Sequence, residues 1–284
     1  MTEAEGSIAP AELTCSRLRR IGEGIGRVVY GSQHWVVKRE RTPVEVVALI
    51  LVWKLLRKLP AGLTRRLLER PSKRVRLMRL FTQAGLLVIP MQVWFTSHVR
   101  EIRKLYRSRD LRGERLTQTY LAGTSLIPRR ITFPPTRVKI AGWPGHLTVT
   151  EAEERVESTL YQRLATLASA GQFELLEEWL NRFLDLRQQG WQRGLFSVDA
   201  HLKNFGVTGD RIVLIDPGGV TDRWEDVEAK LCFEEVVSQP HVQLGLGPVL
   251  GGCPEVASRF NARWKALVNA SVVWGHWPKP SDSL

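Results

Sequence analysis

Two polar loops in the second half of the chain, separated by an apolar strand, constrain the fold more than any other feature. The segment SVDAHLKNFGV places Asp199 and Asn204 five residues apart, directly after a predicted helix at 173–189 and a short β segment. The segment IVLIDPGG places Asp216 at the end of the apolar strand. Burying a carboxylate there is costly unless it meets a cation, although Asp-Pro-Gly-Gly also forms turns without one. We expect the two loops to meet at one site.

The composition is that of a globular protein with one large domain or two lobes. The chain has 284 residues, of which 43% are hydrophobic and 25% charged. Its formal charge of +12 favours an anionic membrane surface, nucleic acid or a phosphorylated substrate, or it serves solubility alone. Among these partners we expect no nucleic acid.

The cysteines and the apolar runs indicate a cytoplasmic location. The three cysteines are isolated in the sequence, which suggests neither a disulfide framework nor a zinc site. The N-terminus lacks the cationic and then apolar order of a signal peptide. The most apolar run, 46–53, is far shorter than the roughly 20 residues needed to cross a bilayer. We therefore expect a soluble or peripheral protein.

Periodicity and turn residues predict a β-rich first part and a helical second part. The expected elements are strands within 17–40, helices at 43–59 and 63–84, short strands at 86–95, 101–108 and 114–123, helices at 151–170 and 173–189, β segments at 194–198 and 210–216, and a mostly helical end at 222–277 with a glycine-rich interruption at 244–252. A link rich in Pro and Gly spans 123–146. We therefore expect an N-terminal arm at 1–16, an N-terminal lobe at 17–122 with inserted basic helices, and a C-terminal lobe at 123–284.

A glycine-rich hairpin and a following lysine suggest a place for phosphate groups. Gly22, Gly24 and Gly26 lie between two predicted strands, where their backbone can pass close over phosphates and offer its amides. An ordinary flexible hairpin is the alternative. Lys38, at the end of the next β segment, can reach phosphates if it faces a cleft, or it is a surface lysine. Its acidic partner is Glu69 or Glu45, and the sequence does not decide between them.

These segments together suit the transfer of a γ-phosphoryl group, which requires bound phosphates, a metal that neutralises charge, and an acceptor hydroxyl held in line. The spacing of Asp199 and Asn204 lets a tight loop aim a carboxylate at the hydroxyl and an amide oxygen at a metal ion. An extended segment at Thr119 to Leu121 is positioned to hydrogen-bond an adenine edge through its backbone.

At this point the sequence resembles the protein-kinase-like superfamily over most of residues 17–222. Protein kinases carry D-x-K-x-x-N in the catalytic loop, whereas His201 follows Asp199 by two residues here. This resembles the D-x-H-x-x-N loops of small-molecule and sugar kinases, such as aminoglycoside phosphotransferases and lipopolysaccharide core kinases. The stretch PSKRVRLMRLFTQAGLLVIPMQVWF is similar to the lipopolysaccharide kinase family, in which a basic helix runs into a G-x-x-x-P segment. Here that segment contains Gly85 and Pro90.

The resemblance implies an α+β, two-lobed protein-kinase-like fold with the nucleotide cleft between a β-rich N-lobe and a helical C-lobe. It implies ATP and Mg²⁺ as cofactors, Asp199 as the catalytic base or hydroxyl-orienting group, Asn204 and Asp216 as magnesium ligands, and Lys38 as the phosphate anchor. The chain departs from the family pattern where Ser197 replaces the usual His, Pro217 the usual Phe, and Arg27 the third Gly.

The expected function is a kinase that phosphorylates a sugar hydroxyl on a lipid-linked glycan, such as the lipopolysaccharide core, at the inner face of the cytoplasmic membrane. The apolar segment 44–56 lies beside a dense cationic one, which suits a peripheral membrane contact or, equally, a buried helix beside a solvated face. The cationic residues are Arg65, Arg66, Arg70, Lys73, Arg74, Arg76 and Arg79. The alternatives are an atypical Ser/Thr protein kinase and a pseudokinase that binds a partner or nucleotide without turnover.

Overall fold

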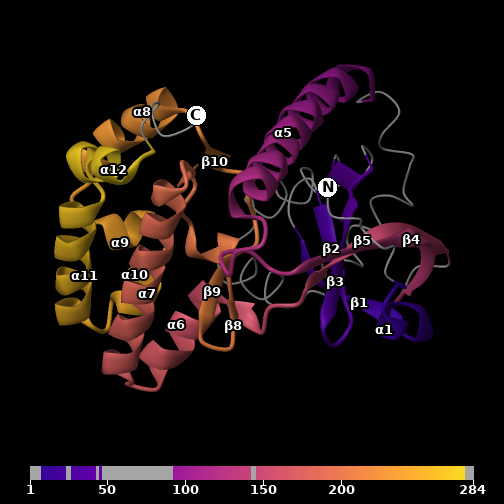
Figure 1. The fold of residues 1–284 in the computed structure, drawn as a ribbon, viewed down its shortest axis with the longest axis horizontal. Helices are drawn as coiled ribbons and strands as arrows, with labels where there is room; N and C mark the ends of the chain where they lie inside the picture. Colours follow the sequence, from indigo (N-terminus) through magenta and orange to yellow (C-terminus); the bar gives the residue numbers. More distant parts are fainter. Residues whose placement is uncertain (1–7, 24–26, 43–44, 47–91, 142–144, 279–284) are drawn as a thin grey trace. The chain divides into compact units, whose positions relative to one another are not determined.

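The computed structural model describes residues 8–23, 27–42, 45–46, 92–141 and 145–278, and its fold is mixed α+β (Figure 1). The chain divides into two compact units. Unit 1 comprises Met1–Ser108 and Ile131–Ala152, and unit 2 comprises Arg109–Arg130 and Glu153–Leu284. The predicted helices at 43–59 and 63–84, except for residues 45–46 in a helical turn, lie outside the described residues. The same holds for Glu69 and the cationic residues at 65–79.

Unit 1 is built on a sheet whose first three strands were predicted correctly. They are β1 (Arg17–Glu23), β2 (Arg27–Gly31) and β3 (Trp35–Glu40), paired antiparallel in sequence order. Val28 and Tyr30, on either side of the less buried Val29, point into a core that also contains Leu18 and Val37. The sheet has the order β1-β2-β3-β5-β4 and closes into a barrel through parallel pairing of β1 with β4.

The strands β4 (Arg130–Ile140) and β5 (His146–Glu154) correct the prediction of a link at 123–146. Phe133, Val138 and Val149 from these strands are buried in the same core as β1 to β3. Half of the segment therefore belongs to the N-terminal sheet, although Pro134 and Pro135 lie within β4. Proline usually marks a turn or a link, and the Pro-rich composition therefore suggested one here. A strand tolerates proline at positions that donate no ladder hydrogen bond.

The expected loose arm at 1–16 is partly wrong, because α1 (Ala11–Cys15) packs on the sheet. Leu13 is fully buried, and Glu12 accepts hydrogen bonds from the Ser32 hydroxyl and the His34 amide. One apolar side chain and one carboxylate hold this short helix to the β2–β3 turn.

A long helix, α5 (Gln92–Leu121), replaces the strands predicted at 101–108 and 114–123 and begins within the strand predicted at 86–95. Gly113, Thr117 and Leu121 are buried at intervals of four residues, which is the spacing of one helix face. The Thr117 hydroxyl donates to the Gly113 carbonyl at 2.5 Å, one helical turn earlier. Two of these buried residues are Gly and Thr, so an apolar periodicity does not reveal the helix.

Unit 2 contains the two helices predicted before the first polar loop, α6 (Leu160–Ser169) and α7 (Phe173–Gln192). The first starts nine residues later than predicted, because residues up to Glu154 extend β5 and β6 (Ser158–Thr159) follows. Thr159 caps α6 in a capping box: its hydroxyl accepts from the Gln162 amide at 3.2 Å, and the Gln162 side chain accepts from the Thr159 amide at 2.9 Å.

Short strands follow α7 and carry the two polar loops. A two-stranded sheet pairs β7 (Phe196–Ser197) with β10 (Val220–Thr221). A three-stranded sheet has the order β6-β8-β9, with β8 at Phe205–Thr208 and β9 at Arg211–Leu214. The β character predicted at 194–198 and 210–216 is confirmed.

The helical end of the chain is also confirmed. Its helices are α8 (Trp224–Glu235), α9 (Pro240–Gln243), α10 (Gly247–Leu250), α11 (Pro254–Leu267) and α12 (Ala270–His276), and α10 lies within the predicted glycine-rich interruption. None of the helices in the described part of the chain is long and apolar enough to span a membrane.

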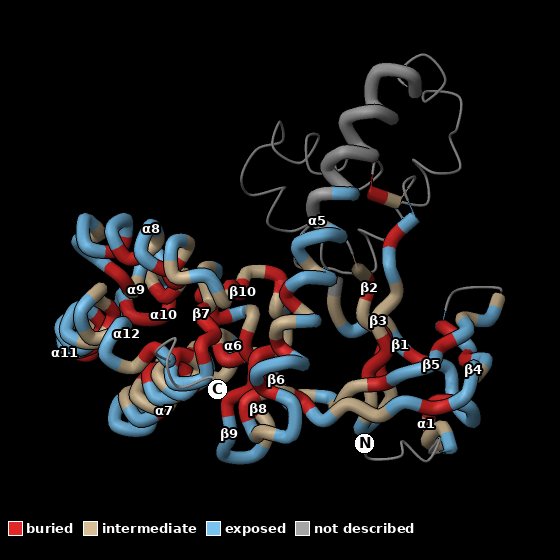
Figure 2. The backbone as a smooth tube through the Cα atoms, turned by 45° about the horizontal axis from the view of Figure 1, so that its top comes forward, coloured by how far each residue is buried: buried red, intermediate tan, exposed pale blue. Residues whose placement is uncertain are grey.

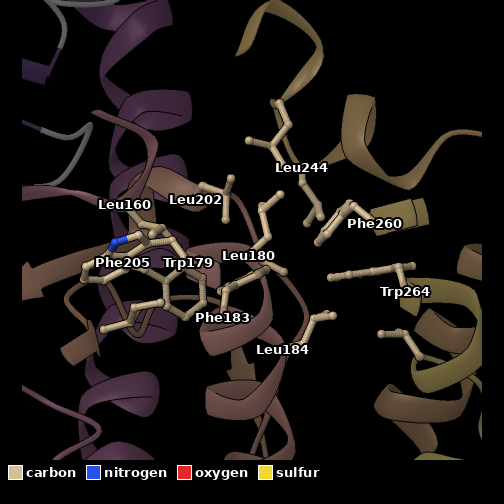
Figure 3. Packing of buried hydrophobic residues seen from close by; sticks show 14 of the residues in the cluster. Leu160, Trp179, Leu180, Phe183, Leu184, Leu202, Phe205, Leu244, Phe260 and Trp264 are labelled. Atoms are coloured by element: carbon tan, nitrogen blue, oxygen red, sulfur yellow. The ribbon is translucent and has the colours of Figure 1, made fainter. Parts of the chain in front are cut away.

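The core of unit 2 lies between α7, the strands after it and α11 (Figures 2 and 3). Phe183 is at its centre, with its ring edge-on to Phe205 at 5.0 Å and stacked near Trp264 at 6.4 Å. All three residues are almost fully buried. This packing fixes α7 against β8, the strand that begins directly after Asn204.

Candidate active site

The first polar loop is anchored at both ends. It begins after β7 and ends in a 3₁₀ turn, Leu202–Asn204, whose Leu202 side chain is fully buried. His201 caps this turn, because its Nδ1 accepts a hydrogen bond from the Lys203 amide at 3.3 Å. The Asn204 amide donates to the His201 carbonyl at 2.8 Å. Asp199 therefore lies on a short bridge between a β strand and a buried turn.

Asp199, Asn204 and Asp216 are brought together through backbone atoms. The Asn204 Nδ2 donates to the carbonyl oxygen of Asp199 at 3.1 Å. The Asn204 carbonyl in turn accepts from the Asp216 amide at 3.1 Å and from the Ile215 amide at 2.9 Å. Since the Asn204 amide nitrogen is used in the loop, its amide oxygen is the atom that can face a cation.

The second polar loop forms the turn that its sequence suggests, and the turn locks against the first loop. The Asp216 Oδ1 accepts from the Gly218 amide at 3.2 Å. The Gly219 carbonyl accepts from the amides of Val198 and Asp199, at 2.7 and 3.3 Å. A Cβ on Gly219 would lie 2.5 Å from the Cβ of Asp199, which is closer than real side chains approach. The Asp-Pro-Gly-Gly segment therefore forms a turn and, through Gly219, also contacts the loop that carries Asp199.

Arg109 on α5 is a site residue that the sequence did not reveal. Its Nη2 lies 3.3 Å from the Asp199 Oδ2, and its Nε donates to the Gly218 carbonyl. Both charged side chains are about half exposed, so solvent screens the pair and its net energy is small. One turn further along α5, a Cβ on Gly113 would overlap the Pro217 carbonyl oxygen. The expectation of strands hid this helix face, whose signal is the four-residue spacing from Arg109 to Gly113 and Thr117.

His201 lies beside the loop in a partly buried position. Burial lowers its pKa from the ordinary histidine value, the cation of Lys203 lowers it further, and Asp199 opposes both effects. The imidazole is close to Gly245, where an added Cβ would lie 2.7 Å from Nε2. Gly245 has a φ of +81°, a conformation that favours glycine.

The donor set suits a hard cation. The Asp216 carboxylate and the Asn204 amide oxygen are the oxygen ligands that Mg²⁺ prefers, and protein sites for Mg²⁺ are commonly completed by water and substrate phosphates. Within the described ranges, no group of three or more His, Cys, Asp or Glu side chains could hold a metal. Asp216 and Asn204 are therefore the two residues of this site that could hold such a cation.

The predicted phosphate-binding residues lie in unit 1. Gly22 is on β1 opposite Val29, next to a register shift, whereas Gly24 and Gly26 lie outside the described residues. Lys38 is a half-buried residue of β3, also paired with Val29. The candidate partner Glu45 pairs with Arg39, in two hydrogen bonds of 3.0 and 2.6 Å.

The geometry predicted for the adenine-binding segment is wrong. Thr119 and Leu121 lie in the last turn of α5 and not in an extended segment. Thr119 is exposed and Leu121 is buried in the core of unit 2. Helical amides point along the helix axis to the preceding turn, so this segment does not offer the row of backbone donors and acceptors on which the assignment relied.

Comparison with known proteins found no relative of this chain. No protein-family model matches the chain, and no curated protein matches it.

Proposed function

We propose that the protein is a kinase that transfers the γ-phosphoryl group of ATP to an alcohol. The observation that carries the proposal is the hydrogen-bonded contact between the two polar loops, in which Asn204 bonds the backbone of both Asp199 and Asp216. Phosphoryl transfer depends on positioning and charge stabilisation more than on covalent chemistry. One fixed carboxylate for the acceptor and one carboxylate with an amide for the metal meet these needs.

Asp199 is the residue proposed to orient the acceptor hydroxyl and accept its proton. Its backbone carbonyl accepts from the Ser197 hydroxyl at 3.2 Å and from Asn204, which restricts the backbone that carries the carboxylate. The carboxylate itself is about half exposed, so an acceptor can reach it from solvent. Ser197, which departs from the family pattern, thus still contributes a hydrogen bond to this loop.

Asp216 and Asn204 would hold Mg²⁺, which supplies neutralising charge to the phosphates when it is bound with ATP. Lys38 and the glycine-rich hairpin of unit 1 would contact the phosphates themselves. The protein-kinase-like, two-lobed arrangement is part of this proposal. It is supported by the five-stranded N-terminal sheet and by the position of the loops after α7 in a helix-rich unit.

For the acceptor we propose a sugar hydroxyl on a lipid-linked glycan. The support is the charge of +12 and the resemblance of the sequence to lipopolysaccharide kinases. Co-sedimentation with anionic vesicles at low salt tests the membrane part: the protein should pellet, and added salt should release it. Failure to pellet with anionic lipid would remove the membrane contact and leave the phosphotransferase proposal intact.

The test of the function is mass-spectrometric detection of a phosphorylated product after incubation of the protein with MgATP and a lipid-glycan extract. Wild type should add one phosphate to an extract component, and Asp199→Asn should not. The matched control is Asp210→Asn, in the turn between β8 and β9, which should behave as wild type. Equal product with Asp199→Asn would contradict the role of Asp199.

The ion pair between Arg109 and Asp199 favours a second candidate, a nucleotide-binding protein without turnover. In this state the proposed catalytic carboxylate is engaged by a guanidinium from α5. If the pair only blocks an active enzyme, Arg109→Met should raise ATP turnover. If the protein is a pseudokinase, turnover should stay at background in the variant while nucleotide binding persists.

A further inference from the structure

Arg187 is a charged side chain in the middle of the unit 2 core. It lies on α7, is 4% exposed, and its guanidinium stacks against Phe196 at 5.1 Å and Trp264 at 4.8 Å. Trp191 lies a little farther away, at 5.7 Å. Aromatic faces attract a guanidinium, but they contact its flat faces and leave the N–H groups at its edge without acceptors.

Most of these N–H groups lack a partner. Nη2 donates to the Ser197 carbonyl at 3.5 Å, the long limit of a hydrogen bond, while Nε and Nη1 are buried and meet no acceptor among the described residues. Within the same residues no carboxylate forms an ion pair with Arg187. The carboxylate of Glu234 favours the charged form of Arg187 by Coulomb attraction without an ion pair between them. Glu234 pairs instead with Lys230 at 3.1 Å.

Arg187 nevertheless remains charged at neutral pH. Burial lowers its pKa to about 10, with Glu234 opposing the effect, and that value still lies well above 7. A buried cation with two unsatisfied donors is costly unless a counter-ion or another acceptor meets it. The core therefore has a strong local preference for a negative group at the edge of this guanidinium.

The space for such a group is a cavity of about 40 Å³ lined by Arg187 and Ser197. Its other walls are apolar and include Leu126, Phe205, Leu214 and Val220. This volume has room for about three water-sized spheres. This space accepts a monatomic ion together with a water molecule. Water alone would supply acceptors without neutralising the charge.

We propose that this cavity binds a small monovalent anion of the chloride class, held by the Nε and Nη1 of Arg187. The formal charge of +12 enriches such anions around the protein. Because Ser197 and Val220 form the β7–β10 pair and also line the cavity, the anion ties α7 to the strands that carry both polar loops. The site is independent of the proposed kinase function.

The test compares unfolding of the full chain by urea in chloride, bromide and gluconate at constant ionic strength. Gluconate is too large for the cavity. An anion that binds only the folded state raises the folded-to-unfolded ratio tenfold for each tenfold increase above its dissociation constant. Wild type should show this increase with chloride and bromide, and Arg187→Met should not. Arg182→Met, which removes a partly exposed arginine from the same helix, should retain it.

Bromide also locates the ion directly. In crystals grown with bromide, an anomalous scattering peak should lie at hydrogen-bonding distance from Nε and Nη1 of wild-type Arg187. A cavity holding only water, or equal unfolding midpoints of wild type in chloride and gluconate, would overturn the proposal. If Arg187→Met does not fold, the wild-type bromide map decides the question alone.

Discussion

Adding one methyl group at Gly219 should disturb both polar loops at once. In Gly219→Ala the new Cβ would lie 2.5 Å from the Cβ of Asp199, 3.0 Å from Nη2 of Arg109 and 3.1 Å from the backbone nitrogen of Asp199. Ordinary contact begins at 3.4 Å, so the two Cβ atoms must separate by about 0.9 Å. The Arg109 guanidinium can move aside, but neither Asp199 atom is the end of a flexible side chain, and the shift must therefore move the backbone of one loop.

This displacement has two measurable consequences. Overpacking of this kind costs about 1–3 kcal/mol of folding free energy, which urea denaturation measures. A misplacement of about 1 Å at a reacting group costs about 100-fold in rate, so ATP turnover of the proposed kinase should fall by that order. The control is Gly252→Ala, because its Cβ would meet nothing within 4 Å.

The result that would refute the reasoning is equal behaviour of the two variants. If Gly219→Ala matches Gly252→Ala in both stability and turnover, the two loops do not approach as closely as described. If it loses stability but keeps full turnover, the loops interlock as described but the position of Asp199 does not matter for the reaction.

Two further predictions concern stability in the separate units. Glu45→Gln should flatten the acid limb of the unfolding free energy in urea titrations at pH 3 to 6. Burial raises the pKa of Glu45, but hydrogen bonds from Arg39 and the Thr42 amide lower it more, so its pKa in the folded protein lies below the ordinary value. The ionised Glu45 therefore stabilises the fold at pH values above the ordinary pKa, and this contribution is lost as pH falls through the folded pKa. A variant that keeps the full acid dependence would contradict this pairing. Thr159→Ala should cost about 1 kcal/mol by removing the cap of α6, and Thr159→Ser should restore most of it; equal stability of all three proteins would show that the capping box contributes nothing.

The elements best predicted from the sequence are those whose buried face consists of apolar side chains. Residues 17–40 contain short runs of β-branched and aromatic residues on either side of a turn at 31–33, and α7 presents Leu176, Leu180, Phe183 and Leu184 at helical spacing, so both were predicted correctly. The helix α5 was missed because its buried face includes Gly113 and Thr117, which carry no apolar signal. The strand β4 was missed because it contains Pro134 and Pro135, and prolines mark turns more often than strands. The end of β5 was missed because residues 151–154 were assigned to the following helix.

The contact between the two polar loops was expected from sequence, because the phosphoryl transfer inferred for Asp199, Asn204 and Asp216 requires them at one site. The roles of the three residues in them remain predictions. The four-residue spacing of Arg109, Gly113 and Thr117 marks one helix face, but the approach of Arg109 to Asp199 depends on where that helix packs, and no local pattern encodes that position. The same limit applies to Arg187, which sequence alone places on a helix but not inside a core.

The most direct measurement of the central claim is calorimetric binding of a non-hydrolysable ATP analogue with and without Mg²⁺, in wild type and Asp216→Asn. If Asp216 and Asn204 hold the metal, wild type should bind the analogue markedly more tightly with Mg²⁺, and the variant should lose that difference while remaining folded. Wild-type affinity that is the same with and without Mg²⁺, or no binding at all, would contradict the account.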